Sequence, residues 1–515
     1  MPHISSFDRN QSFFFCIDDF IEPDNSVRII DAFVDSLNLE DLGFVTFDSS
    51  SPGQQPYSRF ALLKLLLYGY TKGIRSSRKL ADACSDSISF MWLVNGISPS
   101  KSCICDFVKV NETAIQNTFK LFVRFLLFAD FIDAKIDVID GTKIRAQNSR
   151  NKYFSIKKID NTISYFNSQI KHFTSLLKDA QSDAASDPDA AISFNEKISN
   201  YKQKIEEFSN LKKKLNDNNL SQITLTDPDS RMMTSHGNSD ISYNMQTSVD
   251  SKNSLIITSD VVSEVNDTNQ LENMLSKSAD VLGRVPDNTV ADMGYFNTEQ
   301  IDNCENLGSN VFVKQPKSKN STNNSDFSID KFSYDAKRNI YTCPAGKQLK
   351  FVRKLSKKKN KSDDKPSIIG YEYFCSDCAG CPHLHDCTSS VDGRRVTRNA
   401  YQDTIDRVQK RFEENPDMYT IRKSVVEHPF GTIKRSLGFT YFLRRGLNAV
   451  RTEASLICLA YDIKRLANIS NIDDIKKKLE EFFLHFRYFF YCFLLFSKKI
   501  INSKNEFMIF LIYLF

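Results

Sequence analysis

The sequence has little of three features that would each point to a class of protein. Its net charge is only +5 over 515 residues, so the overall charge does not mark a nucleic-acid binder. The first ten residues have no basic stretch leading into an apolar run, so we expect no secretory signal. The apolar runs 482–496 and 507–515 fall short of the ~20 residues of a membrane span. The sequence therefore predicts a cytoplasmic protein without a membrane anchor.

The composition is that of an ordinary globular protein with room for several domains. Hydrophobic residues make up 41% and charged residues 25%, which is enough for a sizeable core. At about 150 residues a domain, the length allows about three domains. The 12 cysteines should lie in a reducing cytoplasm, where clustered cysteines bind metal more often than they form disulfides.

Hydrophobic periodicity divides the chain into helical and mixed segments. Residues 57–128 read as helices, and their basic turn suits a helix-turn-helix-like DNA contact or a solvated face; its residues are Arg75, Arg78 and Lys79. Apolar steps of three and four predict an antiparallel coiled-coil hairpin. We expect these domains: 1–128, helical and of the DNA-binding type; 129–313, the first part of a core with the hairpin inserted at 158–218; 314–400, a Lys-rich linker and Cys-rich insert; 401–470, the helical end of the core; 471–515, a Phe-rich tail.

The core segment alternates strands and helices. A strand over 132–139 leads to Asp140, and two further strands are predicted at 242–249 and 255–259. A helix over about 268–282, a strand ending at Asp292, a further helix and a strand at 311–313 follow. This order predicts an α/β domain of the ribonuclease-H kind, in which helices flank a mixed sheet.

Three carboxylates are candidates for a site of divalent cations. Phosphodiester cleavage needs an activated oxygen nucleophile and neutralised charge, and two Mg²⁺ ions about 3.5–4 Å apart supply both. Mg²⁺ prefers carboxylate oxygens, so such a site needs about three carboxylates from separate elements. Asp140 and Asp292 end two strands, and Glu427 lies near a helix. Residue chemistry alone leaves alternatives open, because Asp137 could replace Asp140, and Glu453 could replace Glu427.

Five ordered motifs between about residues 57 and 468 resemble the DDE transposases of bacterial insertion sequences. The segment LLKLLLYGYTKGIRSSRKLADAC resembles that family's N-terminal domain, and IDGTKIRAQNSR resembles its first-aspartate motif. DPDSRMM with YNMQTSVD, then ADMGYFNTEQI, and then VEHPFGTIKRSLGFTYFLRRGLNAVRTEASL resemble the three motifs that follow. The resemblance implies an RNase-H-like core, double-stranded DNA as partner, two Mg²⁺ or Mn²⁺ ions, and a homo-oligomer in the synaptic complex.

The resemblance also implies roles for single residues. Asp140 and Asp292 match the two metal-binding aspartates, and Glu427 matches the glutamate. Tyr419, Arg422 and Lys434 would bind phosphates beside the cut. Arg422 stands five residues before Glu427 rather than the expected four, where Lys423 stands, so either residue could take this role. Water would cleave a phosphodiester at the element's terminal inverted repeat, and the freed 3′-hydroxyl would attack target DNA. A related nuclease without strand transfer, and an inactive relic that only binds DNA, are the alternatives.

A cysteine cluster follows the Lys-rich segment. Cys343 precedes the pattern C-x2-C-x2-C-P-x4-C, and His383 and His385 lie inside it. Zn²⁺ takes four thiolate or imidazole ligands, and closely spaced cysteines supply such a site. We favour a structural zinc site, like that of a zinc ribbon, from Cys343, Cys378, Cys381 and Cys387; free thiols or an iron–sulfur cluster are the alternatives.

The helices after residue 401 are rich in basic residues and aromatics. Basic residues neutralise phosphates, and aromatics can stack on unpaired bases, although aromatics are more often part of a core. We expect DNA contacts close to Glu427 from Lys434, Arg435, Arg444 and Arg445.

Overall fold

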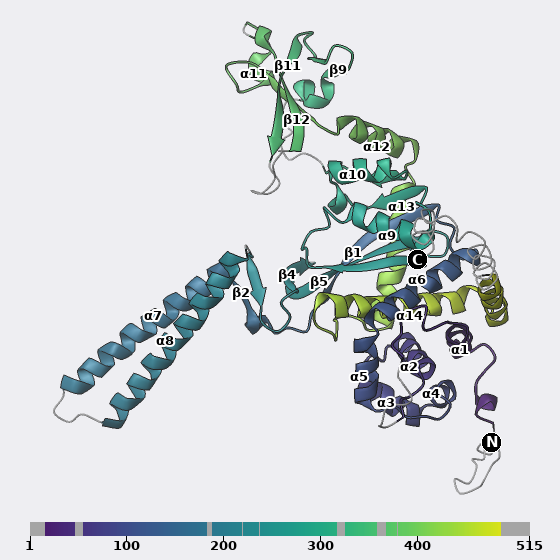
Figure 1. The fold of residues 1–515 in the computed structure, drawn as a ribbon. Helices are drawn as coiled ribbons and strands as arrows, with labels where there is room; N and C mark the ends of the chain where they lie inside the picture. Colours follow the sequence, from purple (N-terminus) through teal and green to yellow (C-terminus); the bar gives the residue numbers. More distant parts are fainter. Residues whose placement is uncertain are drawn as a thin grey trace, which may run out of the picture. The chain divides into compact units, whose positions relative to one another are not determined.

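The chain forms two structural units, which we describe separately (Figure 1). The computed structural model describes residues 16–46, 55–182, 188–218, 220–235, 237–316, 325–357, 367–378 and 380–485. Unit 1 consists of residues 1–133, 141–265 and 427–515, and unit 2 consists of residues 134–140 and 266–426. Most of the predicted Phe-rich tail lies outside the described residues. Within them, no helix has both the length and the apolar character needed to cross a membrane.

Unit 2 is built on parallel strands. β1 (Ile136–Arg145) pairs with β7 (Asn288–Ala291), and β7 pairs with β8 (Asn310–Val313), both in parallel. The ends of β7 and β8 read TVA and VFV, the continuous apolar pattern of strands that are covered on both faces. The helices α9 (Leu271–Leu282) and α10 (Thr298–Asn306) supply buried residues to the same core.

Unit 1 contributes antiparallel strands. β4 (Arg231–Ser235) and β6 (Ile256–Val262) both pair in antiparallel fashion with β5 (Asn238–Asp250), β4 with its first half and β6 with its second half. The strand order is β4-β5-β1-β7-β8, and β6 also pairs with β5. Parallel and antiparallel strands therefore share one sheet, which confirms the predicted mixed sheet with helices.

The predicted limits of the first strand are wrong at both ends. We expected a strand from Ile132 to Ile139 that ends at Asp140, whereas β1 begins at Ile136 and continues to Arg145. Ala134 has a φ of 53°, which interrupts an extended chain before β1. At the other end, the backbone of Arg145 bonds to Thr440 and Phe442, so a distant segment extends the strand. Asp140 therefore lies within β1 and not at its end.

Helices make up most of the rest of the described part of unit 1. The helical pattern predicted for residues 57–128 is confirmed, and its helices follow α1 (Val27–Asp35). They are α2 (Arg59–Thr71), α3 (Ser77–Asp86), α4 (Ile88–Leu93), α5 (Lys101–Val110) and α6 (Glu112–Phe128). α2 is buried on nearly every side, and its one buried lysine, Lys64, pairs with Asp31 and Asp35 at 2.6 and 2.7 Å. The long helix α14 (Leu447–Ile469) packs against α2, α6 and β6.

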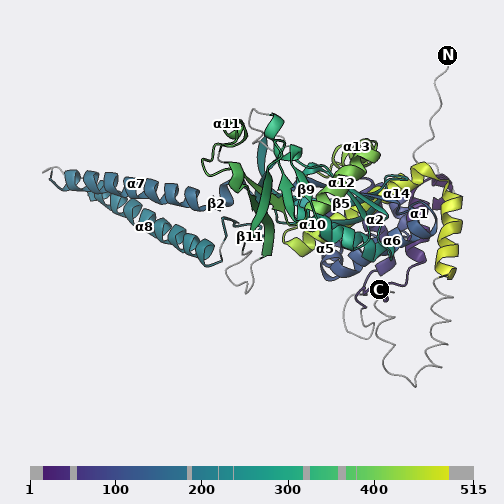
Figure 2. The same cartoon turned by 90° about the horizontal axis from the view of Figure 1, so that it is seen from above.

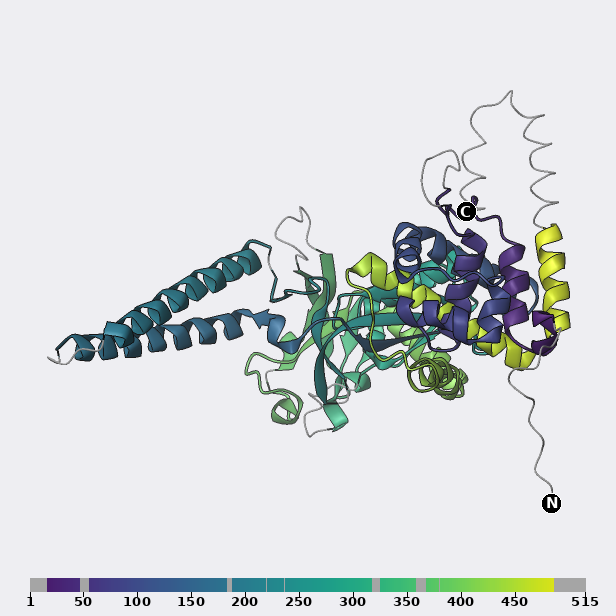
Figure 3. The ribbon, with the colours of Figure 1, turned by 90° about the horizontal axis from the view of Figure 1, so that it is seen from below.

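Two long helices occupy the segment with heptad spacing. α7 (Ile156–Ser182) and α8 (Pro188–Asp217) lie side by side, as Figures 2 and 3 show from opposite sides. Aromatic pairs join them, with ring centroids 5.5 Å apart for Phe166 and Tyr201 and 5.8 Å apart for Phe173 and Phe194. The short strands β2 (Tyr153–Ser155) and β3 (Gln222–Thr224) close the base of this hairpin. The helical pair that the spacing predicts is therefore present.

The Lys-rich and Cys-rich segment of unit 2 carries a second, antiparallel sheet. Its strands are β9 (Ser333–Asp335), β10 (Ile340–Thr342), β11 (Gln348–Lys357), β12 (Ser367–Phe374) and β13 (Arg395–Asn399). The order is β13-β12-β11-β10-β9. The lysines of β11 thus lie on a strand, where we expected a linker, because its apolar positions join a small core around Tyr341, Leu349 and Tyr373.

A buried carboxylate joins three segments of unit 1. Glu453 on α14 has no exposed surface, and its oxygens accept the backbone N–H groups of Leu443 and Arg444 at 2.9–3.0 Å. Arg75, from the turn between α2 and α3, forms an ion pair with it at 3.1 Å. Burial raises the pKa of the Glu453 carboxyl, and the two N–H groups and Arg75 oppose that shift. Glu453 therefore fixes the loop before α14 and is not available as a metal ligand.

We expect Glu453→Ala to lower the free energy of unfolding by about 3–5 kcal/mol, because it leaves the buried Arg75 guanidinium without its carboxylate and two N–H groups without an acceptor. Urea denaturation followed by circular dichroism measures the change. The matched control is Glu480→Ala, an exposed glutamate, which should change stability by less than about 0.5 kcal/mol. A loss below about 1 kcal/mol in Glu453→Ala would contradict this assignment.

Candidate active site

Strand register brings two predicted aspartates together in unit 2. Ile139 of β1 is paired in parallel with Ala291 of β7, so Asp140 and Asp292 are the next residues on neighbouring strands. One guanidinium contacts both: Arg422 Nη1 lies 3.3 Å from Asp140 Oδ2, and Arg422 Nη2 lies 3.3 Å from Asp292 Oδ1. The Asp140 side chain is 23% exposed and that of Asp292 is 44% exposed, so both carboxylates reach solvent.

A helix brings aromatic and basic groups to the same aspartates. α13 (Met418–Gly431) carries Arg422, which is buried, and Tyr419, whose hydroxyl lies 3.5 Å from Asp292 Oδ1. The guanidinium of Arg422 also stands 5.4 Å from the centroid of the Tyr419 ring, and the ammonium groups of Lys314 and Lys423 lie at 5.6 and 6.0 Å. Two acidic residues are therefore balanced by a cluster of cations around one ring.

The structure distinguishes Asp140 from Asp137. Side chains alternate along a strand, so residues 137 and 140 point to opposite faces of β1. Asp137 has no exposed surface, whereas Asp140 meets Arg422 at the solvent. This favours Asp140 as the functional aspartate.

Glu427 shares α13 with Arg422 but not its face. Glu427 is exposed, and at about 100° a residue it lies roughly 140° around the helix from Arg422. α13 contains Pro429 in its last turn, and a π-helix (Thr432–Ser436) follows it. Among the described residues, no three His, Cys, Asp or Glu side chains are close enough together to hold a metal ion. The fold therefore joins two of the three predicted carboxylates around a guanidinium.

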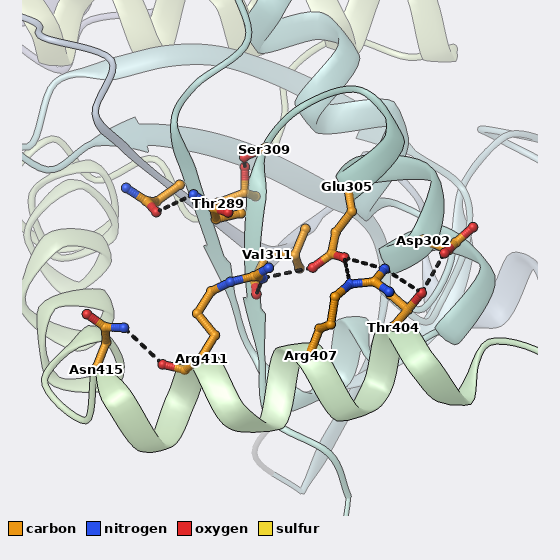
Figure 4. A network of polar contacts seen from close by, with 11 residues as sticks. Thr289, Asp302, Glu305, Ser309, Val311, Thr404, Arg407, Arg411 and Asn415 are labelled. Atoms are coloured by element: carbon orange, nitrogen blue, oxygen red, sulfur yellow. Dashed lines mark hydrogen bonds and ion pairs between the residues drawn. The ribbon is translucent and has the colours of Figure 1, made fainter. Parts of the chain in front are cut away.

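A polar network attaches the preceding helix to the parallel strands, as Figure 4 shows. On α12 (Gln402–Glu414), Arg407 and Arg411 bind the Glu305 carboxylate at 2.9 and 2.8 Å. Arg411 also donates to the carbonyl of Val311 on β8 at 2.8 Å, and Thr404 donates to Asp302 of α10 at 2.6 Å. Because α13 follows α12 after a short turn, this network fixes the start of the helix that carries Arg422.

Two of the predicted DNA-binding arginines are engaged inside unit 1. Arg75 is 7% exposed and binds Glu453 and the carbonyl of Tyr441, so within unit 1 it already has the partners that the predicted DNA contact would have to share. Arg444 is 20% exposed and forms an ion pair with Glu112 at 2.8 Å, which also argues against a DNA contact. Each guanidinium is held by a carboxylate that lies more than 300 positions away in the chain.

The other predicted basic residues differ in exposure. Lys434, on the π-helix, donates to the Thr142 hydroxyl in the second half of β1, and burial lowers the pKa of its ammonium group. Four residues are exposed and free to meet a partner from solution: Arg78, Lys79, Arg435 and Arg445.

The predicted zinc ligands line one small pocket in unit 2. Cys343, Cys378, Cys381 and Cys387 surround it together with Cys375 and His383. Burial, and next a hydrogen bond with Cys378, raise the pKa of the Cys375 thiol to about 12. Since no three of these described side chains are close enough to share a metal ion, the zinc site stays a prediction from spacing.

Unit 1 also has a basic hollow that the sequence did not predict. It lies at the end of β1 and is lined by Arg145, Arg150, Lys152 and Arg445, among others. Its residues come from segments almost 300 positions apart, and the only local signal is the basic run RAQNSRNK after the first aspartate motif.

A mixed sheet with helices, in which neighbouring parallel strands present adjacent aspartates, has the architecture of an RNase-H-like core. Two family comparisons agree with it: residues 342–467 match the family "Transposase DDE domain", and residues 15–110 match "Transposase domain (DUF772)". Both matches, at separate parts of the chain, support its assignment as an insertion-sequence DDE transposase. Comparisons with curated proteins and with solved structures found no match.

Proposed function

We propose that this protein cuts DNA at the terminal inverted repeats of an insertion sequence and joins the 3′ ends to target DNA. The proposal rests chiefly on Asp140 and Asp292, which neighbouring strands place side by side against one cation. Matches to two transposase families, one toward each end of the chain, support it. We propose a homo-oligomer as the active form, since two element ends have to be handled together.

The donor atoms at the aspartate pair suit Mg²⁺ or Mn²⁺. Both side chains offer carboxylate oxygens, are partly exposed, and already share one positive group in Arg422. We propose that Asp140 and Asp292 hold the ions and that Glu427, supplied by α13, completes the set. Bound ions would neutralise charge on the reacting phosphate and lower the pKa of water.

The chain's own residues would position the DNA around the reacting bond. Arg422 and Tyr419 lie against the aspartates and can donate hydrogen bonds to a phosphate oxygen. Lys434 is held near the end of β1 by Thr142, and its partly buried charge could bind the neighbouring phosphate. These groups orient the scissile bond so that water, and later a 3′-hydroxyl, can attack in line.

We expect Asp292→Asn to lower Mg²⁺-dependent cleavage of a labelled element end by at least about a hundredfold. Even substitutions next to metal ligands cost about 10–100-fold, and this one removes a ligand charge without changing its size. Binding of the same DNA in a gel-shift assay should be unchanged. Glu427→Gln should behave alike, and the control, Glu414→Gln on the exposed side of α12, should cleave like the native protein.

The outcomes separate the rival functions. Equal loss of cleavage and binding in Asp292→Asn would contradict the assignment of this residue. Native protein that binds inverted repeats but never cleaves them would be an inactive relic. Cleavage without transfer of the 3′ end to a target plasmid would indicate a nuclease of the same fold.

We expect Arg422 to compete with divalent cations for the two aspartates. Removing its charge in Arg422→Met leaves two carboxylates uncompensated, so Mn²⁺ should bind more tightly and raise the melting temperature by more than it does in the native protein. Differential scanning calorimetry with and without Mn²⁺ measures this. Arg422→Lys, which keeps the charge, should show a shift close to the native one. A Mn²⁺-dependent shift in Arg422→Met no larger than the native shift would disprove the competition.

A further inference from the structure

The basic hollow of unit 1 has the size of a ligand site. Its volume is about 450 Å³, within the range of about 300–1,000 Å³ that is usual for such sites. Three parts of unit 1 line it: the segment 145–152, which begins at the last residue of β1, residues 226 and 240–241, and the loop residues Tyr441 and Arg445. The hollow is therefore assembled by the fold and not by a single loop.

Charge in the hollow favours an anion. Four cationic residues line it, against one acidic residue, Asp240. Asp240 is paired with Arg150, whose Nε lies 2.9 Å from its carboxylate. The other three cationic side chains are exposed and form no ion pair within the described part of the chain: Arg145, Lys152 and Arg445. An anionic ligand would thus meet three uncompensated positive charges.

The ring of Tyr441 lies at the same hollow and packs against Arg75. The guanidinium carbon of Arg75 lies 4.6 Å from the centroid of the Tyr441 ring, and Arg75 is itself held by the buried Glu453. The backbone on both sides of Tyr441 is bonded to Arg145, through Thr440 O at 3.3 Å and Phe442 N at 2.8 Å. Yet Tyr441 remains 37% exposed. The fold therefore fixes one face of the ring on a cation and leaves part of the side chain open.

We propose that this hollow binds an unpaired nucleotide of a DNA strand. The base stacks on Tyr441, and the flanking phosphates contact Arg145, Lys152 and Arg445. Stacking between a base and an aromatic side chain needs a free base face, which a paired base inside a duplex does not offer. The inference rests on the proposed function, because it takes DNA as the substrate. It adds a second binding site, outside the aspartate pair, for a nucleotide that is separated from its complementary strand.

Binding of labelled oligonucleotides to the full chain, measured by fluorescence anisotropy in EDTA, tests the proposal. The probes are a twelve-nucleotide thymidine strand and a blunt duplex of the same length. Tyr441→Ala should weaken binding of the single strand about tenfold to a hundredfold, whereas Tyr441→Phe should bind it like the native protein. Binding of the duplex should change by less than about threefold in both variants.

Salt dependence tests the cations separately. Each lost phosphate contact lowers the slope of log affinity against log salt by about 0.7 for single strands. Lys152→Ala combined with Arg445→Ala should therefore lower that slope by about 1.4. Lys171→Ala, which removes one exposed charge from α7, is the control and should leave the slope for the single strand unchanged.

Two results would overturn the proposal. One is single-strand binding by Tyr441→Ala as tight as native binding; the other is an equal loss for strand and duplex. If Tyr441→Ala proves unfolded by calorimetry, Tyr441→Leu keeps the apolar bulk without the ring and gives the same decision. Because these measurements need no metal, they are independent of the cleavage assay. Native protein that cleaves DNA while Tyr441→Ala binds normally would defeat only this inference.

Discussion

The repulsion between two aspartates on neighbouring parallel strands is the constraint on which unit 2 depends. At the usual strand spacing of about 4.8 Å and an effective dielectric constant of about 20, two full charges repel by roughly 3 kcal/mol. Parallel pairing of β1 with β7 forces the two aspartates to lie side by side, because residues 140 and 292 directly follow the paired residues Ile139 and Ala291. The sheet tolerates it because Arg422 supplies a shared positive charge. A carboxylate pair that already shares one cation suits the exchange of that cation for a metal ion that we propose.

The polar network of α12 serves to place the Arg422 guanidinium beside the two aspartates. Arg422 lies more than 100 residues after Asp292, and the second sheet and the Cys-rich segment intervene. Its helix is placed by polar contacts of α12 with α10 and β8, in which the nearly buried Glu305 receives two arginines. Direct contact between α12 and the parallel strands means that the inserted sheet need not hold α13 in position. Large insertions can thus interrupt the core without moving its charged residues.

Local sequence patterns predicted the helices and strands that depend on residues close together in the chain. Asp292 follows a short β-branched strand, and the helices and the hairpin follow apolar spacing, so these features could be read directly. The end of β1 could not be predicted from local patterns, because its last residue is bonded to a segment around Thr440, almost 300 positions away. The same limit applies to Arg75 and Arg444. A basic residue on a turn looks available for DNA until a distant carboxylate, here Glu453 or Glu112, is known to face it.

Buried carboxylates therefore separate two kinds of basic residue in this fold. Glu453 binds the backbone of Leu443 and Arg444 and the side chain of Arg75, and it thereby fixes the loop that bears Tyr441 and Arg445. Arg444 forms an ion pair with Glu112, whereas the side chain of its neighbour Arg445 is exposed. Cations with internal partners set the positions of loops, whereas Arg445, which has no ion-pair partner among the described residues, is one of those that we propose for an anionic ligand. Adjacent arginines of identical chemistry thus take opposite roles, since only one of them can be neutralised from within.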